Sequence, residues 1–249
     1  MNSMSGLDGM VERMDEEQNA PGMSGGVGGV GAGNNTVDLN VNPNVTTDRD
    51  QKFYDKHICG SFEDMELKDK LLRGIYSIGF EVPSAIQQKA IVPFTDNHDL
   101  IAQAQSGTGK TATFSIGMLQ NLDENLDKTQ AIILTHTREL ALQSYNVVTA
   151  LSKYMKINVN LTIGGNSVRE NIDELVSNPH VVIGTPGRIL DMINKSALST
   201  KYLQMLIVDE ADEMLSKNFL SQIHEIFQYL PGNIQVGLFS ATMPNEFFG

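Results

Sequence analysis

Six short apolar runs alternate with amphipathic segments, and this alternation limits the fold more than any other feature of the chain. The runs have the length and composition of buried β-strands and occupy residues 99–105, 130–135, 157–163, 180–185, 204–210 and 234–240. The segments between them have helical spacing and cover residues 111–121, 138–154, 167–176, 186–194 and 213–230. Nearly continuous apolar strands that alternate with helices predict an α/β fold, in which helices cover both faces of a parallel sheet.

A sheet of this kind also predicts where the functional residues lie. Ligands of such sheets bind beyond the carboxyl ends of the strands. Most of the unusual polar and glycine-rich clusters of this chain directly follow an apolar run. We therefore expect the site at that edge of the sheet.

The first 55 residues differ in composition from the rest of the chain. Residues 1–50 hold nine of the 22 glycines, together with eight acidic residues and two arginines, a net charge of −6. A segment this polar cannot bury enough apolar surface to offset its ordering entropy. We predict a disordered, acidic, glycine-rich tail at 1–55 and one compact domain at 56–249. The tail is either a solvated segment without a specific task or an arm that docks a partner.

The overall charge narrows the class of partners. Eighteen basic and 30 acidic residues give a net charge of −12, which argues against binding nucleic acid by bulk charge.

The single cysteine, Cys59, excludes an intramolecular disulfide and fits a reducing compartment. We expect a cytoplasmic protein, with a nuclear location as the alternative. We expect no membrane partner and no secretory signal, because the sequence has neither an 18-residue apolar stretch nor a basic, then apolar N-terminus.

The segment "AQSGTGKT" follows the first apolar run and precedes a helical pattern. Its glycines let backbone N–H groups turn toward phosphate oxygens, and the helix start adds partial positive charge. In this pattern the lysine reaches the outer phosphates and the threonine hydroxyl binds Mg²⁺. The alternative is a plain strand-to-helix turn. The predicted nucleotide-binding residues are Ala104, Gln105, Ser106, Gly107, Thr108, Gly109, Lys110 and Thr111.

An acidic pair, Asp209 and Glu210, ends another apolar run and would lie beside the phosphate loop if the two strands are neighbours. Asp209 is placed to hold Mg²⁺, largely through water, with Thr111 as the second Mg²⁺ contact. Glu210 can orient or deprotonate an attacking water. We predict Lys110, Asp209 and Glu210 as the catalytic set. The alternative is that Asp209 only caps the following helix.

Together with the phosphate loop, "DEAD" at 209–212 and "SAT" at 240–242 resemble a DEAD-box RNA helicase. More of that family's pattern follows in order, with "GFEVPSAIQ" (79–87), "TRELA" (137–141), "GG" (164–165) and "TPGR" (185–188). The resemblance covers about residues 61–247. The stretches 71–91 and 209–219 are most similar to the translation initiation factor 4A branch. The resemblance implies a RecA-like P-loop domain that uses ATP and Mg²⁺ and binds RNA.

The resemblance also assigns an adenine site. Gln87 matches the glutamine that reads adenine. The amide of a glutamine can donate and accept hydrogen bonds at the edge of that base, and guanine would mismatch this pattern. Phe62 lies 17 residues before Gly79, the family's spacing for an aromatic residue that stacks on adenine. Phe80 is the rival for this role, although it is equally explained as helix packing beside Pro83.

The resemblance implies RNA contacts and a coupling motif. Contacts to the RNA backbone, without base reading, are implied for Thr137, Arg138, Gly164, Gly165, Thr185 and Arg188. An ordinary strand-to-helix turn is the alternative for 185–188. Ser240 and Thr242 match the motif that links ATP hydrolysis to strand separation, and their hydroxyls could bond Asp212. A plain cap of the next segment is the alternative there.

His136 and Asn166 are among the residues that depart from the family pattern. His136 stands where proline is usual, so the loop before Thr137 should be less rigid. Asn166 replaces a common threonine after the glycine pair. Both substitutions lie at implied RNA contacts.

The implied reaction is ATP hydrolysis coupled to local opening of an RNA duplex. The family works through two RecA-like domains, and the second supplies arginines that stabilise the transferring phosphoryl group. We expect that domain in cis or in trans, and weak activity from this chain alone. Scaffold proteins are further candidate partners. Two alternatives stay open: a half-helicase that acts as a nucleotide-dependent interaction or inhibitory module, and another P-loop enzyme such as a GTPase.

Overall fold

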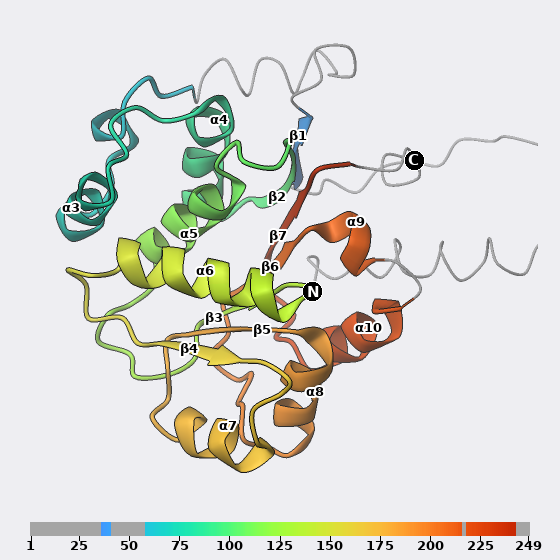
Figure 1. Ribbon diagram of the computed structural model, residues 1–249. Coiled ribbons are helices and arrows are strands. Elements are labelled where there is room, and N and C mark those ends of the chain that lie inside the picture. Colours follow the sequence, from blue (N-terminus) through green and yellow to red (C-terminus); the bar gives the residue numbers. More distant parts are fainter. Residues whose placement is uncertain (1–35, 41–57, 216–217, 243–249) are drawn as a thin grey trace, which may run out of the picture.

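The computed structural model describes residues 36–40, 58–215 and 218–242, and it confirms the predicted α/β architecture (Figure 1). All strand pairs in the sheet are parallel, and the strand order is β1-β2-β7-β6-β3-β5-β4. The strands are β1 (Thr36–Asn40), β2 (Asp99–Gln103), β3 (Ala131–Leu134), β4 (Val159–Thr162), β5 (Val181–Gly184), β6 (Met205–Asp209) and β7 (Gln235–Ser240).

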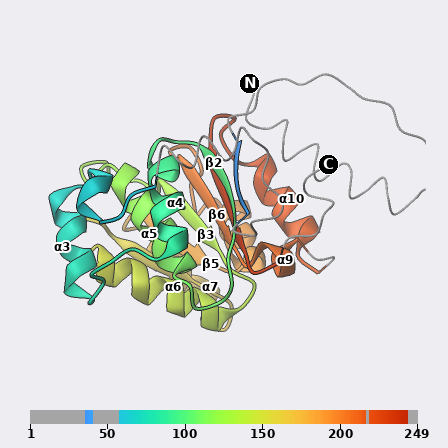
Figure 2. The same cartoon turned by 90° about the horizontal axis from the view of Figure 1, so that it is seen from above.

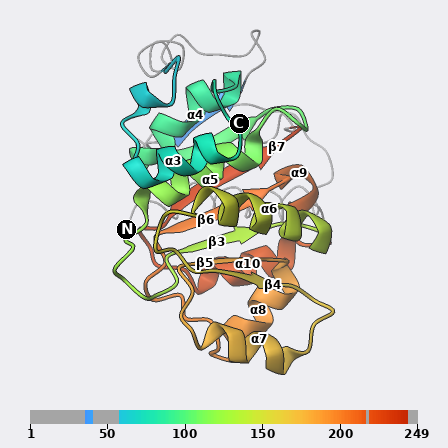
Figure 3. The ribbon, with the colours of Figure 1, turned by 60° about the vertical axis from the view of Figure 1, so that its left-hand side comes forward.

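Helices cover both faces of this sheet (Figures 2 and 3). One face carries α3 (Asp69–Ser77), α4 (Ala85–Thr95), α5 (Lys110–Asn121) and α6 (Arg138–Leu151), with the short 3₁₀ helix η1 (Glu63–Met65) nearby. The other face carries α8 (Pro186–Asn194), α9 (Ala211–Met214) and α10 (Leu220–Gln228). Helix α7 (Val168–Leu175) packs near the edge strand β4. In the described part of the chain, no helix combines the length and apolar content that a bilayer crossing needs.

The alternation of side chains along the strands divides the core into two clusters. On β3, Ile133 packs with α3–α6, whereas Ile132 and Leu134 pack with α8–α10. The first cluster includes Phe239, whose ring contacts Phe114 edge-on at 5.1 Å between centroids. Burial of each such side chain is worth about 1.5–3 kcal/mol. Because both strand faces are buried, the apolar runs lack polar alternation in the sequence.

The helix predicted at 213–230 is two helices in the structure. Helix α9 packs against β6 and β7, whereas α10 packs against α8. Met214 and Ile223 are both fully buried in the second cluster, at different places along it. Both helices have apolar residues at helical spacing, so the pattern alone could not place the break.

The predicted disordered tail contains an element that the sequence did not reveal. Residues 36–40 form the edge strand β1, with Thr36 opposite Asp99 and Asn40 opposite Gln103 of β2. The expectation of irregular structure is corrected for these five residues. The segment TVDLN has only two apolar residues, so it lacks the continuous apolar run by which the other strands were predicted. Residues 1–35 and 41–55 of the predicted tail lie outside the described residues.

Candidate functional site

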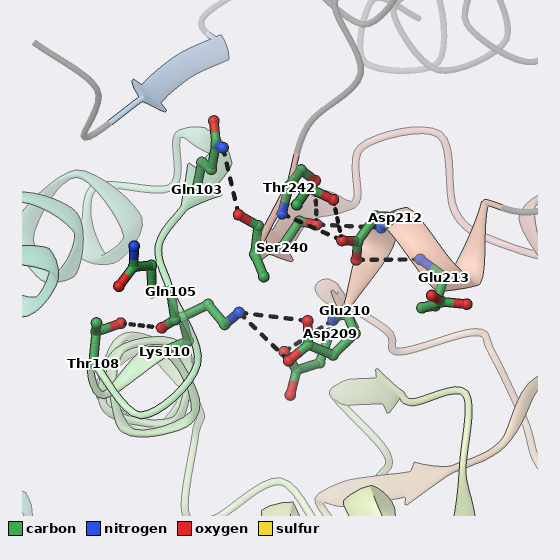
Figure 4. A network of polar contacts seen from close by, with 11 residues as sticks. Gln103, Gln105, Thr108, Lys110, Asp209, Glu210, Asp212, Glu213, Ser240 and Thr242 are labelled. Atoms are coloured by element: carbon green, nitrogen blue, oxygen red, sulfur yellow. Dashed lines mark hydrogen bonds and ion pairs between the residues drawn. The ribbon is translucent and has the colours of Figure 1, made fainter.

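The carboxyl ends of the parallel strands bring most of the predicted site residues to one edge of the sheet. The phosphate loop follows β2, the acidic pair ends β6, and Ser240 ends β7. Strand β7 lies between β2 and β6, so the strands that carry the phosphate loop and the acidic pair are not direct neighbours in the sheet. The side chains meet nonetheless, because Lys110 reaches across the end of β7 toward Glu210 (Figure 4).

Two glycines shape the phosphate loop. Gly107 and Gly109 have φ values of +82° and +100°, a region that costs residues with a Cβ atom free energy. A Cβ atom at Gly109 would also lie 2.8 Å from Nε2 of Gln87. The chain then enters α5 at Lys110, so the first N–H groups of that helix lie at the loop. Residues 105–108 are exposed, whereas Lys110 is only 5% exposed.

Gln87 ties the start of α4 to the phosphate loop. Its Oε1 accepts a hydrogen bond from the backbone N–H of Ser84 at 2.8 Å, within a capping box. The hydroxyl of Ser84 donates to the carbonyl oxygen of Thr108 at 2.8 Å. The structure thus brings Gln87 beside Gly109, as a nucleotide-site residue requires. The reading of adenine by Gln87 stays a prediction.

The expected stacking of Phe62 on adenine requires a correction. Phe62 is 0% exposed and belongs to the first core cluster, so its ring presents no free face to a base. Sequence spacing could not show that the ring points into the core beneath η1. Phe80 is half-buried and packs against the same cluster.

The acidic pair faces Lys110 across a largely buried space. The Nζ atom of Lys110 lies 3.4 Å from both carboxylate oxygens of Glu210. Asp209 is only 4% exposed. Burial first, and then the neighbouring charge of Glu210, raises the pKa of Asp209 to about 6, although Lys110 opposes the shift. A carboxylate held in this environment gains from a nearby divalent cation.

The helix-cap alternative for Asp209 does not match the geometry. The N-cap residue of α9 is Glu210, and the cap has no side-chain hydrogen bond. Oδ1 of Asp209 accepts from the N–H of Glu210 at 3.0 Å, and this N–H precedes the first residue of the helix. Glu210 has φ +51°, a left-handed conformation that is unusual for a residue with a side chain. In this conformation the Glu210 carboxylate lies 3.4 Å from Nζ of Lys110. Strained backbone of this kind concentrates at functional sites.

The donor set fits Mg²⁺ and a nucleotide phosphate chain. Asp209 and the hydroxyl of Thr111 are hard oxygen ligands of the kind that Mg²⁺ prefers, and the ion would offset the negative charge of the buried carboxylate. The left-handed glycines and the N-terminus of α5 provide amides for phosphate oxygens. Lys110 supplies the matching positive charge.

Asp212, Ser240 and Thr242 form a polar cluster beyond the ends of β6 and β7 (Figure 4). The hydroxyl and the N–H of Thr242 both donate to Oδ2 of Asp212. Burial alone would raise the pKa of Asp212, but hydrogen bonds, led by that of the Thr242 hydroxyl, lower it. The Ser240 hydroxyl also bonds Asp212, as predicted: it accepts from the backbone N–H of Asp212, and it donates to the carbonyl of Thr242.

Arg138 rests directly on the glycine pair of the loop between β4 and α7. A Cβ atom at Gly164 would lie 3.2 Å from Nη2 of Arg138, and one at Gly165 would lie 2.7 Å from Nη1. Gly165 also has φ +104°. Glycines are therefore needed here for the guanidinium to lie against the backbone.

Arg188 approaches the same loop from α8. Its Nη2 donates to the carbonyl oxygen of Asn166 at 3.1 Å, and its Nη1 donates to the side chain of Asn171. The remaining predicted contacts are N-caps: Thr137 accepts from Leu140 N–H at 3.2 Å, whereas the Thr185 side chain makes no cap bond in the described chain. The two arginines, the glycine pair and the two threonines thus line one end of the sheet.

The comparisons with known proteins agree with this geometry. Residues 84–247 match the DEAD/DEAH box helicase family. The chain belongs to this family.

Among curated relatives of this DEAD-box domain, eukaryotic initiation factor 4A of Caenorhabditis elegans is 52% identical over 209 residues, which cover 84% of this chain and 52% of the relative. The ATP-dependent RNA helicase eIF4A of Neosartorya fischeri is 58% identical over 193 residues, with 78% and 48% covered. A structure of Dbp5 from S. cerevisiae bound to RNA and ADP BeF3 matches with a TM-score of 0.70 at 35% identity, covering 76% of this chain and 48% of that one. The DEAD-box chain thus spans about half the length of these relatives.

Two residues of the DEAD-box domain gain roles that motif reading missed. Ser84 was detectable, because Ser-x-x-Gln before a helix predicts a capping box. Asn171 carries no such signal. His136, the departure from the family pattern, is half-buried, and its Nδ1 is buried with no hydrogen-bond partner among the described residues.

Proposed function

We propose that the chain forms the nucleotide- and RNA-binding RecA-like domain of an ATP-dependent RNA helicase of the initiation factor 4A type. The observation that carries this proposal is the contact of Lys110, at the phosphate loop, with Glu210, beside the buried carboxylate of Asp209. The arginine pair at 138 and 188 lies at the same edge of the sheet. An ATP site and a polyanion site on one edge allow one ligand to influence the other.

Each residue of the ATP site has a distinct task in the proposed reaction. The loop 104–111 binds the phosphates through backbone amides, and Lys110 neutralises charge on the outer phosphates. Asp209 and Thr111 would hold Mg²⁺ largely through water, and the ion would offset charge that develops on the phosphoryl group. Glu210 orients the attacking water and accepts its proton. Gln87 selects adenine at the start of α4.

RNA binding rests on backbone contacts rather than on base reading. Arg138 and Arg188 present guanidinium groups to phosphates, which suits a chain whose net charge is −12. Thr242 bonds Asp212, three residues after Asp209, so this cluster can transmit the nucleotide state to the RNA side. Coupled duplex opening requires a second RecA-like domain, in cis or in trans, whose arginines complete the phosphoryl site.

RNA-stimulated ATPase measurements test the proposal. Residues 1–249 should bind ATP with Mg²⁺ and hydrolyse it slowly, and a matching second domain added in trans should raise RNA-stimulated turnover. Glu210→Gln should abolish that gain while nucleotide binding persists. Robust RNA-stimulated turnover by the chain alone would contradict the need for a second domain.

The remaining outcomes separate the proposal from other classes of protein. ATP and RNA binding without any gain from a second domain would favour an interaction module. Tighter binding of GTP than of ATP would indicate a GTPase. A chain that binds neither nucleotide would refute the ATP site.

A further inference from the structure

A buried asparagine on α7 holds the guanidinium of Arg188. Asn171 is 0% exposed, yet its side chain is an amide. Its Oδ1 accepts a hydrogen bond from Nη1 of Arg188, and its Nδ2 donates to Oε2 of Glu174 at 3.4 Å. The two bonds define which end of the amide faces the arginine. A buried amide costs free energy unless it is bonded in this way.

The bonds continue from Asn171 to the sheet. Oε2 of Glu174 also accepts from Nδ2 of Asn160 at 3.2 Å. Oδ1 of Asn160 in turn accepts from the hydroxyl of Thr162 at 2.6 Å, and both residues belong to β4. The acceptor that faces Arg188 is thereby anchored to a strand of the sheet.

Arg188 is also tied to the glycine loop, where its Nη2 donates to the carbonyl oxygen of Asn166. A guanidinium carries five N–H donors, and these two bonds use one on each terminal nitrogen. The remaining N–H groups of the Arg188 guanidinium make neither of these two bonds and can face a phosphate. Arg138 rests on Gly164 and Gly165 of the same loop. The loop therefore relates the positions of the two arginines.

We propose that Asn171 is a positioning residue for RNA binding, which holds the Arg188 guanidinium in the orientation that receives an RNA phosphate. This rests on the proposed function of Arg188 as an RNA contact. An arginine side chain has many rotamers, and fixing one of them on binding costs conformational entropy. Holding it before RNA arrives removes part of that cost from binding, so affinity depends on the acceptor at 171.

Two variants separate positioning from packing. Asn171→Leu keeps a side chain of similar size in a buried place but removes the acceptor. The pair Asn171→Asp with Glu174→Gln moves the carboxylate to 171 and the amide to 174. This exchange keeps the net charge, and it can keep the bonds to Arg188 and Asn160. A purely structural role would leave the RNA affinity of the folded protein unchanged in both variants.

The measurement is binding of a labelled single-stranded oligouridine to residues 1–249, with an ATP analogue and Mg²⁺, at several salt concentrations. Asn171→Leu should weaken binding about tenfold, the size of a lost charged hydrogen bond. It should also lower the salt slope by about 0.7, the value for one phosphate contact to a single strand. Arg188→Ala should have the same effect, and the double variant should add nothing. The exchanged pair should bind within about twofold of the wild type.

Controls make the failures distinguishable. The affinity for the ATP analogue should be equal in all variants, and circular dichroism should show them folded at the assay temperature. If the wild type binds RNA and Asn171→Leu binds equally well, the positioning role is refuted while the RNA function stands. If no variant, the wild type included, binds RNA, the proposed function fails and the role of Asn171 in RNA binding fails with it.

Discussion

Replacing Asp209 with asparagine should stabilise the protein while removing the proposed Mg²⁺ site. The pKa of Asp209 is about 6 in the folded chain against an ordinary value of 3.8. The difference is about 2.2, and each unit corresponds to 1.36 kcal/mol, so the ionised carboxylate costs the native state about 3 kcal/mol. Asparagine removes that charge, and its Oδ1 can still accept from the N–H of Glu210.

The sign of the pH dependence follows from the raised pKa. Above pH 6, Asp209 is ionised in both folded and unfolded chains, and the full cost is present. Between pH 6 and about 4 the folded chain binds a proton that the unfolded chain releases, so the cost falls as pH falls. The stability advantage of Asp209→Asn should therefore be largest at neutral pH and should vanish near pH 4.

Thermal unfolding without nucleotide, in the presence of a chelator, measures this difference. At pH 7.5 the variant should melt about 6–12 °C above the wild type, since a domain of this size gains about 2–4 °C per kcal/mol. Glu213→Gln is the matched control, because it removes one carboxylate from an exposed place in α9, four residues further along the chain, and should change the melting temperature little. With Mg²⁺ and an ATP analogue added, the wild type should gain more stability than Asp209→Asn. An equal melting temperature at pH 7.5, or a gap that does not depend on pH, would refute the reasoning.

Three further perturbations test other parts of the site and fold. Gly165→Ala introduces a Cβ atom 2.7 Å from Arg138 Nη1 at a residue with φ +104°. RNA affinity in a fluorescence anisotropy titration should therefore fall about tenfold, while ATP affinity stays unchanged. Equal RNA affinity would contradict the packing of Arg138. Thr242→Val removes the hydroxyl bond to Asp212, so RNA-stimulated turnover with a second domain should drop while separate ATP and RNA affinities persist; an unchanged stimulation would exclude coupling through this bond. Deletion of residues 1–55 removes β1, so amide hydrogen exchange in β2 should accelerate, and unchanged protection there would argue against the β1–β2 pairing.

Much of the fold could be predicted because its signals are local. Each of the six predicted strands appears within two residues of the expected bounds, since a buried strand needs a short apolar run whatever it pairs with. The phosphate loop was equally readable, because positive φ at Gly107 and Gly109 is a requirement of the loop itself. Strand β1 was missed, because its sequence TVDLN has two separated apolar residues rather than a continuous apolar run.

The failures concern which way side chains face. Phe62 has the family's spacing for an adenine contact but is fully buried. The Ser240 hydroxyl does bond Asp212 as predicted, but residue type could not show that the bond runs from the backbone N–H of Asp212. Spacing along the chain places a residue on an element, whereas neighbours from distant segments decide which atoms it reaches.

The sequence by itself determined the α/β class, the phosphate loop and the acidic pair, because each depends on residues within one short segment. Only the tertiary structure decided that Lys110 contacts Glu210 across the end of β7, and that Asn171 holds Arg188 from another helix. These contacts join segments 17 to 100 residues apart, so they depend on strand order and on the packing of helices over the sheet. The pKa of Asp209 belongs with them, since it is burial and the charges of its neighbours that raise it.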